Sequence, residues 1–515
     1  MKQNIIRSAF WVMLITFLSK FLGFFREILI GAQYGINYQT DAFFLATSLP
    51  QIIFSSILLS ISTAFIPMYT DIVTKTNRER GMEYTNRILN TVVIFSILVT
   101  ALCIVYSEDI VKVLAGGFNE EATKITVKFL LISLPMCIFL AVSQIFTGFL
   151  QSNQQYIVSA AINIPANLLL LCVMLLVNGN NIESLVWATV GGTILQIFVQ
   201  IPFLKHQRYV YRLTLGWHDN YVRDTWKLVI PVFISTSIQQ INLLIDRMLA
   251  SGLEEGSISA LNFATKLNGF VFGIVATSIA TIIFPILSKY QSEKDMVEFQ
   301  KTTIKSLNLI TIITLPIVVL TMVLNKPIVQ LLFEHGAFNN EATIMTSGAL
   351  FYYAFGMLFL GYREVLNRVF YSFHDTKTPM INGVIAILVN IIFSIVLAEF
   401  MSFKGIALAS SIAAAVTSIL LLRSMYYKLN IKLDFKMLTT TLKILAASII
   451  AGSSSKIVYE NFNINSIQGD LVIVSKLFFS VIIGVLVYIV SIYLFKIEEV
   501  NIIIKSLKRK FTKNQ

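Results

Sequence analysis

The chain has 515 residues, of which 56% are hydrophobic and 13% are charged, and its formal net charge is +12. This composition excludes an ordinary soluble protein, because apolar runs of about twenty residues, each long enough to cross a bilayer, recur from end to end. Nucleic-acid binding is disfavoured despite the positive charge, since most Lys and Arg residues fall in the short segments between the runs. Such runs must satisfy their own backbone groups, so the sequence predicts an all-α polytopic membrane protein.

Fourteen spans are predicted along the chain, and the charges between them set its orientation. The four longer segments on the side of the N-terminus, 71–87, 205–227, 288–305 and 423–443, carry four, five, four and five Lys or Arg residues. Each segment on the opposite side carries at most one. Because short loops rich in Lys and Arg stay cytoplasmic, both termini are predicted to be cytoplasmic. The predicted spans are 5–30, 41–69, 88–106, 122–150, 156–177, 183–204, 226–250, 257–287, 304–324, 340–370, 379–399, 404–422, 439–458 and 472–495.

The first two spans carry ionisable residues inside apolar runs. Lys20 and Glu27 are seven residues apart and therefore share one helix face, Arg26 points about a quarter-turn away, and Asp41 opens the second span. Ionisable groups in a membrane usually face a protein interior or a water-filled cavity. Arg26 can bind a phosphate through two parallel hydrogen bonds, and Lys20 adds a more diffuse positive charge. The alternative is that these residues form structural ion pairs or extend toward an interface.

The chain is internally duplicated. Residues 42–67 align without a gap on residues 260–285, with nine of 26 positions identical, and the segment FNEEAT at 118–123 recurs as FNNEAT at 338–343. Six predicted spans separate the copies, so the halves share an orientation, as in transporters built from parallel repeats. We predict an N-lobe over 1–210 and a C-lobe over 211–430, each with six spans. A C-terminal helix pair with a basic tail is predicted over 431–515.

A third cation, Lys266, lies in the second copy of the repeated hairpin. The three cations together predict a cationic chamber between the lobes for an anionic substrate. Asp246, next to Arg247 near the end of the seventh span, is interpreted either as half of an interfacial ion pair or as a cation ligand.

The sequence contains no P-loop, no Ser/His/Asp grouping and no Cys or His spacing typical of a metal site. These absences predict a protein that is not an enzyme and has no cofactor. Any transport would then be driven by an ion gradient such as sodium, by the membrane potential or by substrate supply.

Four segments carry a resemblance to a known family: GFFRE at 23–27, TDAFF at 40–44, LFEHGAFN at 332–339 and RVFYSFHDTKTP at 368–379. They resemble the MviN/MurJ family of lipid II flippases, in the multidrug/oligosaccharidyl-lipid/polysaccharide exporter superfamily. The resemblance implies a two-lobed, monomeric transporter of the bacterial cytoplasmic membrane. Such a transporter moves the undecaprenyl-pyrophosphate-linked peptidoglycan precursor outward by alternating access, in support of cell-wall synthesis and cell shape. It also implies that the last two helices hold the lipid tail.

The family's site residues carry over position by position. The resemblance assigns substrate binding to Lys20, Arg26 and Lys266 as cavity cations, together with Glu27 and the TDAFF aspartate Asp41. A sodium site described for some members would comprise Asp246, Asn390, Ser394, the carbonyl of Ile406, and Ser410.

The second span departs from the family pattern. Where members often carry an Arg-Arg pair this chain has Phe54-Ser55, and where they carry Glu-Gly it has Leu58-Leu59. The departure leaves open a flippase for another polyprenyl-linked glycan, of capsule or teichoic type. A multidrug or cation antiporter would require an acidic cavity, and a non-transporting scaffold for envelope synthesis would make the cavity charges dispensable.

Overall fold

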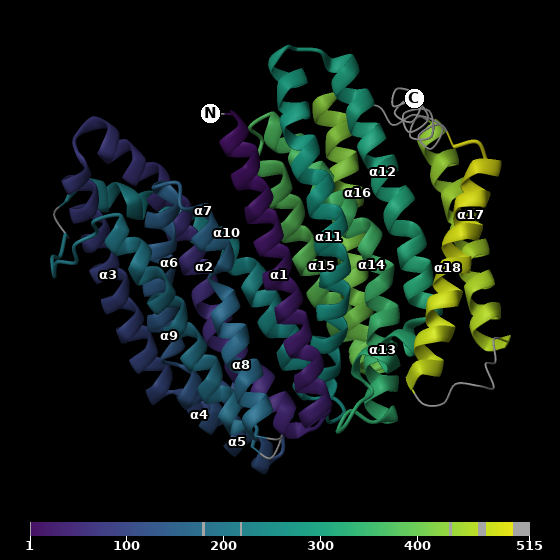
Figure 1. Ribbon diagram of the computed structural model, residues 1–515, viewed down its shortest axis with the longest axis horizontal. Coiled ribbons are helices and arrows are strands. Elements are labelled where there is room, and N and C mark those ends of the chain that lie inside the picture. The colour runs from purple at the N-terminus through teal and green to yellow at the C-terminus, as the bar shows by residue number, and fades with distance from the viewer. Residues whose placement is uncertain (1, 178–180, 217–218, 432–434, 462–469, 498–515) are drawn as a thin grey trace. The chain divides into compact units, whose positions relative to one another are not determined.

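The computed structural model describes residues 2–177, 181–216, 219–431, 435–461 and 470–497. Over these residues the chain forms eighteen α-helices, and it packs into two compact units (Figure 1). The first unit comprises Met1–Ser259 with His335–Phe338, and the second comprises Ala260–Glu334 with Asn339–Gln515. An all-α, multi-span architecture is therefore confirmed.

Ten helices lie wholly in the first unit, and an eleventh begins there. They are α1 (Lys2–Tyr34), α2 (Tyr38–Lys75), α3 (Arg78–Val105), α4 (Ser107–Leu114), α5 (Glu120–Ser133), α6 (Met136–Ser152), α7 (Tyr156–Ala161), α8 (Asn163–Val177), α9 (Glu183–His206), α10 (Asn220–Ser251) and the first turn of α11 (Ser257–Ser292). The predicted span 122–150 is divided into α5 and α6 at Pro135, which lacks the N–H that would continue the helical ladder.

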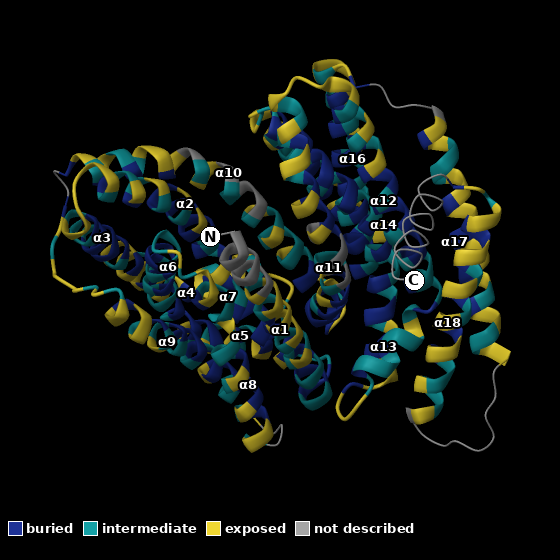
Figure 2. Cartoon of the chain, turned by 45° about the horizontal axis from the view of Figure 1, so that its top comes forward, coloured by how far each residue is buried: buried dark blue, intermediate teal, exposed yellow. Residues whose placement is uncertain are grey.

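The second unit contains the rest of α11 and seven further helices. These are α12 (Met296–Val323), α13 (Asn325–Phe333), α14 (Asn340–Ser372), α15 (Lys377–Met401), α16 (Phe403–Leu429), α17 (Phe435–Asn461) and α18 (Asp470–Leu494). Tyr488 of α18 donates a hydrogen bond to the carbonyl of Ile312 in α12 at 2.6 Å, and this bond joins the C-terminal pair to the unit. Many residues of α17 and α18 are exposed (Figure 2), and large apolar side chains such as Leu442 and Phe478 are among them.

Eleven helical segments of the described chain are long and apolar enough to cross a membrane. They coincide with eleven of the predicted spans. The other three predictions, 5–30, 226–250 and 257–287, fall on α1, α10 and α11. The count of fourteen is therefore not confirmed by length and composition.

The repeated FN-EAT segment has a local structural role. Asn119 and Asn339 each precede a helix, and their Oδ1 atoms accept hydrogen bonds from the backbone N–H groups of Ala122 and Ala342 at 2.8 and 2.9 Å. An Asn side chain at this position satisfies one of the N–H groups that every helix start leaves unpaired. Both copies of the segment thus begin a helix in the same way.

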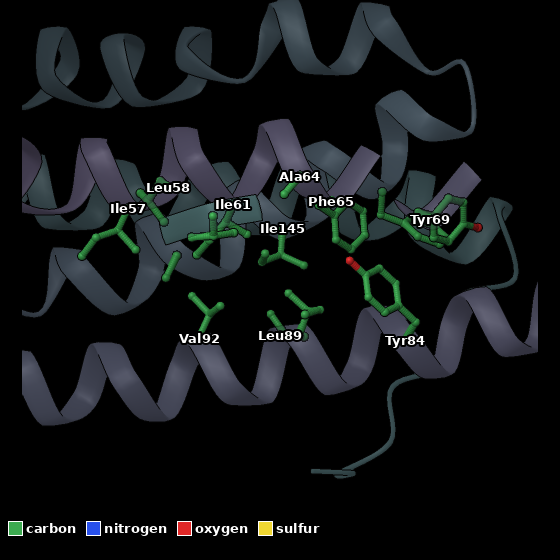
Figure 3. Packing of buried hydrophobic residues seen from close by; sticks show 14 of the residues in the cluster. Ile57, Leu58, Ile61, Ala64, Phe65, Tyr69, Tyr84, Leu89, Val92 and Ile145 are labelled. Atoms are coloured by element: carbon green, nitrogen blue, oxygen red, sulfur yellow. The ribbon is translucent and has the colours of Figure 1, made fainter. Parts of the chain in front are cut away.

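The core of the first unit is built on an apolar stripe of α2. Phe54, Ile61 and Phe65 recur at the spacing that places side chains on one helix face, and each is about 1% exposed. Figure 3 shows Ile61 and Phe65 of this stripe near Tyr84, Leu89 and Val92 of α3 and Ile145 of α6, which belong to the same apolar cluster. The ring of Phe65 stacks on that of Tyr84 with centroids 5.5 Å apart. Because this stripe of α2 packs in the core, the residues of α2 on its other sides can contact the remaining helices of the unit.

Residues 207–216 follow α9 and lie along α3. The amide of Asn86 donates to the carbonyl of Val210 at 2.9 Å, and the amide of Asn90, one turn later, donates to the carbonyl of Thr214 at the same distance. Asp219 precedes α10, where it is buried, forms ion pairs with Arg80 and Arg87 of α3, and caps the start of α10. These contacts help to hold α10 in the first unit, where it also packs on α2.

The predicted lobes and the observed units rest on different criteria. The lobes 1–210 and 211–430 follow the internal repeat, whereas the units follow packing, which places α10 with the first. The lobe boundaries stay a prediction.

Candidate binding cavity

A cavity of about 670 Å³ lies within the first unit, between α1, α2, α6, α8, α9 and α10. Its charged lining residues are Lys20 and Arg26. Its polar, uncharged lining residues are Ser19, Gln51, Ser55, Ser56, Gln144, Asn163, Asn167, Thr189, Thr193, Gln196, Thr236 and Gln240. Carboxylates do not border this cavity among the residues that the structure describes, so its lining is cationic.

The helical period places the cations on the cavity side of α1. Ser19, Gly23 and Arg26 recur at spacings of four and three residues, which align along one face, and Lys20 is their immediate neighbour. Lys20 is exposed to the cavity, whereas the side chain of Arg26 is 25% exposed. Most of the Arg26 side chain is thus packed within the unit, although the residue still borders the cavity.

Two neighbours orient the guanidinium of Arg26. Nη1 donates to Oδ1 of Asn167 on α8 at 3.0 Å, and Nη2 donates to Oε1 of Glu27 at 2.7 Å. The Glu27 side chain is only 3% exposed, so it lies behind Arg26 and does not border the cavity. Asn167 also donates through Nδ2 to the carbonyl of Ser19 at 3.4 Å. Each Nη carries a second hydrogen, so the oriented guanidinium retains donors for a ligand.

The predicted residue Asp41 lies outside the cavity lining. Its side chain is buried and accepts hydrogen bonds from the backbone N–H groups of Gly256 at 2.8 Å and Ser259 at 2.7 Å, and from the Ser259 hydroxyl. Gly256 has φ +85°, and a Cβ there would lie 2.0 Å from a side-chain atom of Ile36, so the approach requires glycine. Asp41 therefore joins the start of α2 to the start of α11 through these hydrogen bonds. Its assignment to substrate binding stays a prediction.

The remaining predicted residues are not among those that line this cavity. Lys266 is an exposed residue of α11 in the second unit. Asn390 and Ser394 on α15 are buried, as is Ile406 on α16, which also carries the half-buried Ser410, and these two helices pack together in the second unit. Asp246 lies on α10 of the first unit, where Nδ2 of Asn242 approaches its Oδ2 at 3.5 Å. Both the Lys266 assignment and the sodium set stay predictions.

The second-span positions that depart from the family pattern divide between core and cavity. Phe54 is 1% exposed in the apolar core, whereas Ser55, Leu58 and Leu59 border the cavity. A hydroxyl and two apolar side chains thus occupy places where the resemblance implies charge. The positive charge of this cavity comes from α1.

Sequence reasoning missed the amides of the cavity. Gln51, Gln144, Asn163, Asn167, Gln196 and Gln240 all border it. The available signal was the recurrence of Asn and Gln at intervals of four residues inside apolar runs, as at Asn163 and Asn167 and at Gln196 and Gln200.

Comparisons of the sequence with known proteins all indicate the same family, over most of the chain. A family model described as Lipid II flippase MurJ matches residues 30–493. A probable lipid II flippase MurJ of Buchnera aphidicola subsp. Baizongia pistaciae is 30% identical over 455 residues, which cover 87% of this chain and 88% of the relative. Its counterpart from Rickettsia prowazekii is 27% identical and covers 96% and 98% of the two chains.

Solved structures extend the comparison to the fold. A structure of lipid II flippase MurJ in an inward closed conformation superposes with a TM-score of 0.81 at 26% identity, covering 94% of this chain and 98% of that one. An inward-facing MATE family multidrug transporter of the MOP superfamily superposes with a TM-score of 0.65 at 11% identity, covering 82% and 98%. The second likeness concerns the fold alone.

Proposed function

Because the chain belongs to the lipid II flippase MurJ family, we propose that it moves lipid II from the inner to the outer leaflet of the bacterial cytoplasmic membrane, with Arg26 and Lys20 binding the pyrophosphate. The observation that carries this assignment is the orientation of Arg26 by Asn167 and Glu27 at the wall of a cavity whose other charged residue is Lys20. A guanidinium matches the geometry of phosphate oxygens, and the ammonium adds attraction without fixed geometry.

The transport step is proposed to be alternating access, in which the site is exposed to one side of the membrane and then to the other. Sequence motifs for nucleotide binding are absent, so the proposed driving force is the membrane potential or a sodium ion. The protein is proposed to act as a monomer, with lipid II and the surrounding membrane lipids as its partners.

The topology proposed for this step has fourteen spans, as two parallel six-span repeats followed by the C-terminal pair, with both termini cytoplasmic. The helices α1, α10 and α11 have 33, 32 and 36 residues and support the proposal, because about twenty residues suffice to cross a bilayer core.

Cysteine labelling tests this orientation. In a chain whose Cys103, Cys137 and Cys172 are replaced by Ser, we expect Glu108→Cys to react with a membrane-impermeant maleimide in intact spheroplasts. Glu79→Cys is expected to react only after permeabilisation, because it lies among the Lys- and Arg-rich segments. If Glu79→Cys is labelled before permeabilisation, residue 79 faces the outside and the proposed orientation is wrong.

A flippase for another polyprenyl-linked glycan remains the second candidate. It is supported by Ser55, Leu58 and Leu59, which place neutral groups where the family pattern has charge. An antiporter of cationic drugs is disfavoured, because Lys20 and Arg26 would repel its substrate.

Complementation separates these candidates. The chain is expressed in a bacterium depleted of its own essential lipid II flippase, and growth is scored together with lipid II accessible at the outer surface. We expect growth and external lipid II to be restored. If the chain inserts correctly into the membrane but restores neither growth nor external lipid II, the lipid II assignment is wrong, and another polyprenyl-linked glycan becomes the proposed substrate.

A further inference from the structure

The cavity of the first unit presents more amides than charges. Five of its side-chain amides, Gln51, Gln144, Asn163, Gln196 and Gln240, are named the amide wall below. They come from five different helices, α2, α6, α8, α9 and α10. An amide offers a carbonyl acceptor and an NH₂ donor side by side. That pairing matches the hydroxyl and acetamido groups of an amino sugar, which also act as both donors and acceptors.

Buried residues hold part of the amide wall in place. Nε2 of Gln196 donates to Oδ1 of Asn163 at 3.1 Å, and its Oε1 accepts from the Ser143 hydroxyl at 3.4 Å. Behind this pair, Nε2 of the fully buried Gln200 donates to the oxygen of Ser143 at 3.0 Å. Gln196 is therefore held by Asn163, another member of the wall, and by Ser143, which does not line the cavity.

The other three members of the wall have accessible side chains. Gln51 is exposed and Gln144 and Gln240 are half-buried, and all three border the cavity. Their donors and acceptors are therefore accessible to a polar ligand in the cavity.

The amide wall lies next to the proposed pyrophosphate site. Arg26 contacts Asn167 on α8, and Asn163 is one turn away on the same helix, about 6 Å along its axis. In a lipid-linked glycan the first sugar is bonded directly to the pyrophosphate, so it lies within about that distance of the phosphate groups. We propose that the amide wall binds the sugar of the substrate and thereby selects glycan-bearing lipids, an inference that rests on the proposed function of Arg26.

The test compares binding of three probes to the full-length protein in lipid nanodiscs: lipid II, the same disaccharide lipid without its peptide, and undecaprenyl pyrophosphate without sugar. We expect both sugar-bearing probes to bind about tenfold more tightly than the bare pyrophosphate lipid. The double variant Gln51→Met with Gln144→Met is expected to lose most of that preference and to keep its affinity for the bare lipid within about twofold. Met keeps the length of the side chain, and a thermal unfolding curve verifies folding.

The control is Gln151→Met on α6, two turns beyond Gln144 and away from the cavity, which should leave all three affinities unchanged. Equal wild-type affinity for the bare and sugar-bearing lipids would overturn the proposal, as would an equal loss for all probes in the double variant. Tight binding of lipid II but not of its peptide-free form would overturn the assignment to sugar. Arg26→Ala tests the premise that Arg26 binds the pyrophosphate. If this variant binds the bare lipid as tightly as the wild type does, the pyrophosphate site is refuted. The difference in affinity between sugar-bearing and bare lipids would still test the amide wall.

Discussion

Replacing Arg26 by Ala is expected to abolish complementation and to lower the rate of lipid II flipping by about a hundredfold or more. The side chain supplies the oriented, charge-assisted donors of the cavity, and each hydrogen bond to a charged group contributes about 1.5–3 kcal/mol. Two such bonds to a pyrophosphate correspond to about two orders of magnitude or more in affinity. Flipping is measured in proteoliposomes by the accessibility of labelled lipid II to an external reagent.

The same substitution also removes an ion pair from the buried carboxylate of Glu27, so loss of activity must be separated from loss of folding. The double variant Arg26→Ala with Glu27→Gln removes the buried charge together with its partner, and it should recover the thermal stability of the wild type without recovering transport. Arg78→Ala is the matched control, because within the part of the chain that the structure describes Arg78 donates hydrogen bonds to Gln207 alone, at an exposed position. Normal flipping by the double variant would refute the role of Arg26.

Asp41→Ala is expected to lower the free energy of unfolding by about 2–4 kcal/mol. The substitution leaves the buried N–H groups of Gly256 and Ser259 without their acceptor, and each unsatisfied buried group costs about 1–3 kcal/mol. The cost would appear as a lower temperature of thermal unfolding in detergent. We expect this loss even without substrate, because the hydrogen bonds of Asp41 lie within the protein.

A neighbouring carboxylate provides the control for Asp41. Glu255 accepts a hydrogen bond from the backbone N–H of Tyr38 at 3.0 Å, but its side chain is exposed, so water can replace it. Glu255→Gln should therefore leave the unfolding temperature nearly unchanged. A stability of Asp41→Ala equal to that of the wild type would show that the buried junction does not depend on its carboxylate.

The first-span cations could be predicted because charge in an apolar run is a local signal. Lys20 and Arg26 border a cavity within the first unit, and Glu27 forms an ion pair with Arg26. The chamber between the lobes and the binding roles of these residues stay predictions. The N-cap role of Asn119 and Asn339 is equally local, since the side chain bonds to a backbone group three residues ahead. What the sequence did not supply was Asn167, which is 141 residues from the arginine that it orients.

Asp41 illustrates the opposite case. The resemblance assigns Asp41 to substrate binding, which stays a prediction. The structure adds two backbone partners, 215 and 218 residues away, at a buried junction. A carboxylate that accepts two backbone N–H groups has the same appearance in sequence as one that faces a cavity. Only the path of the chain distinguishes them.

The sequence by itself determined the membrane class, the internal repeat and the cationic stretch of α1, because hydropathy, spacing and charge are properties of neighbouring residues. The tertiary structure decided which polar groups share a cavity and which form hydrogen bonds or ion pairs inside the protein. The amide wall is the clearest instance: each Gln or Asn is unremarkable in its own span, and the five meet only because five helices pack around one space. Their convergence depends on contacts between residues far apart in the chain, which no local pattern encodes.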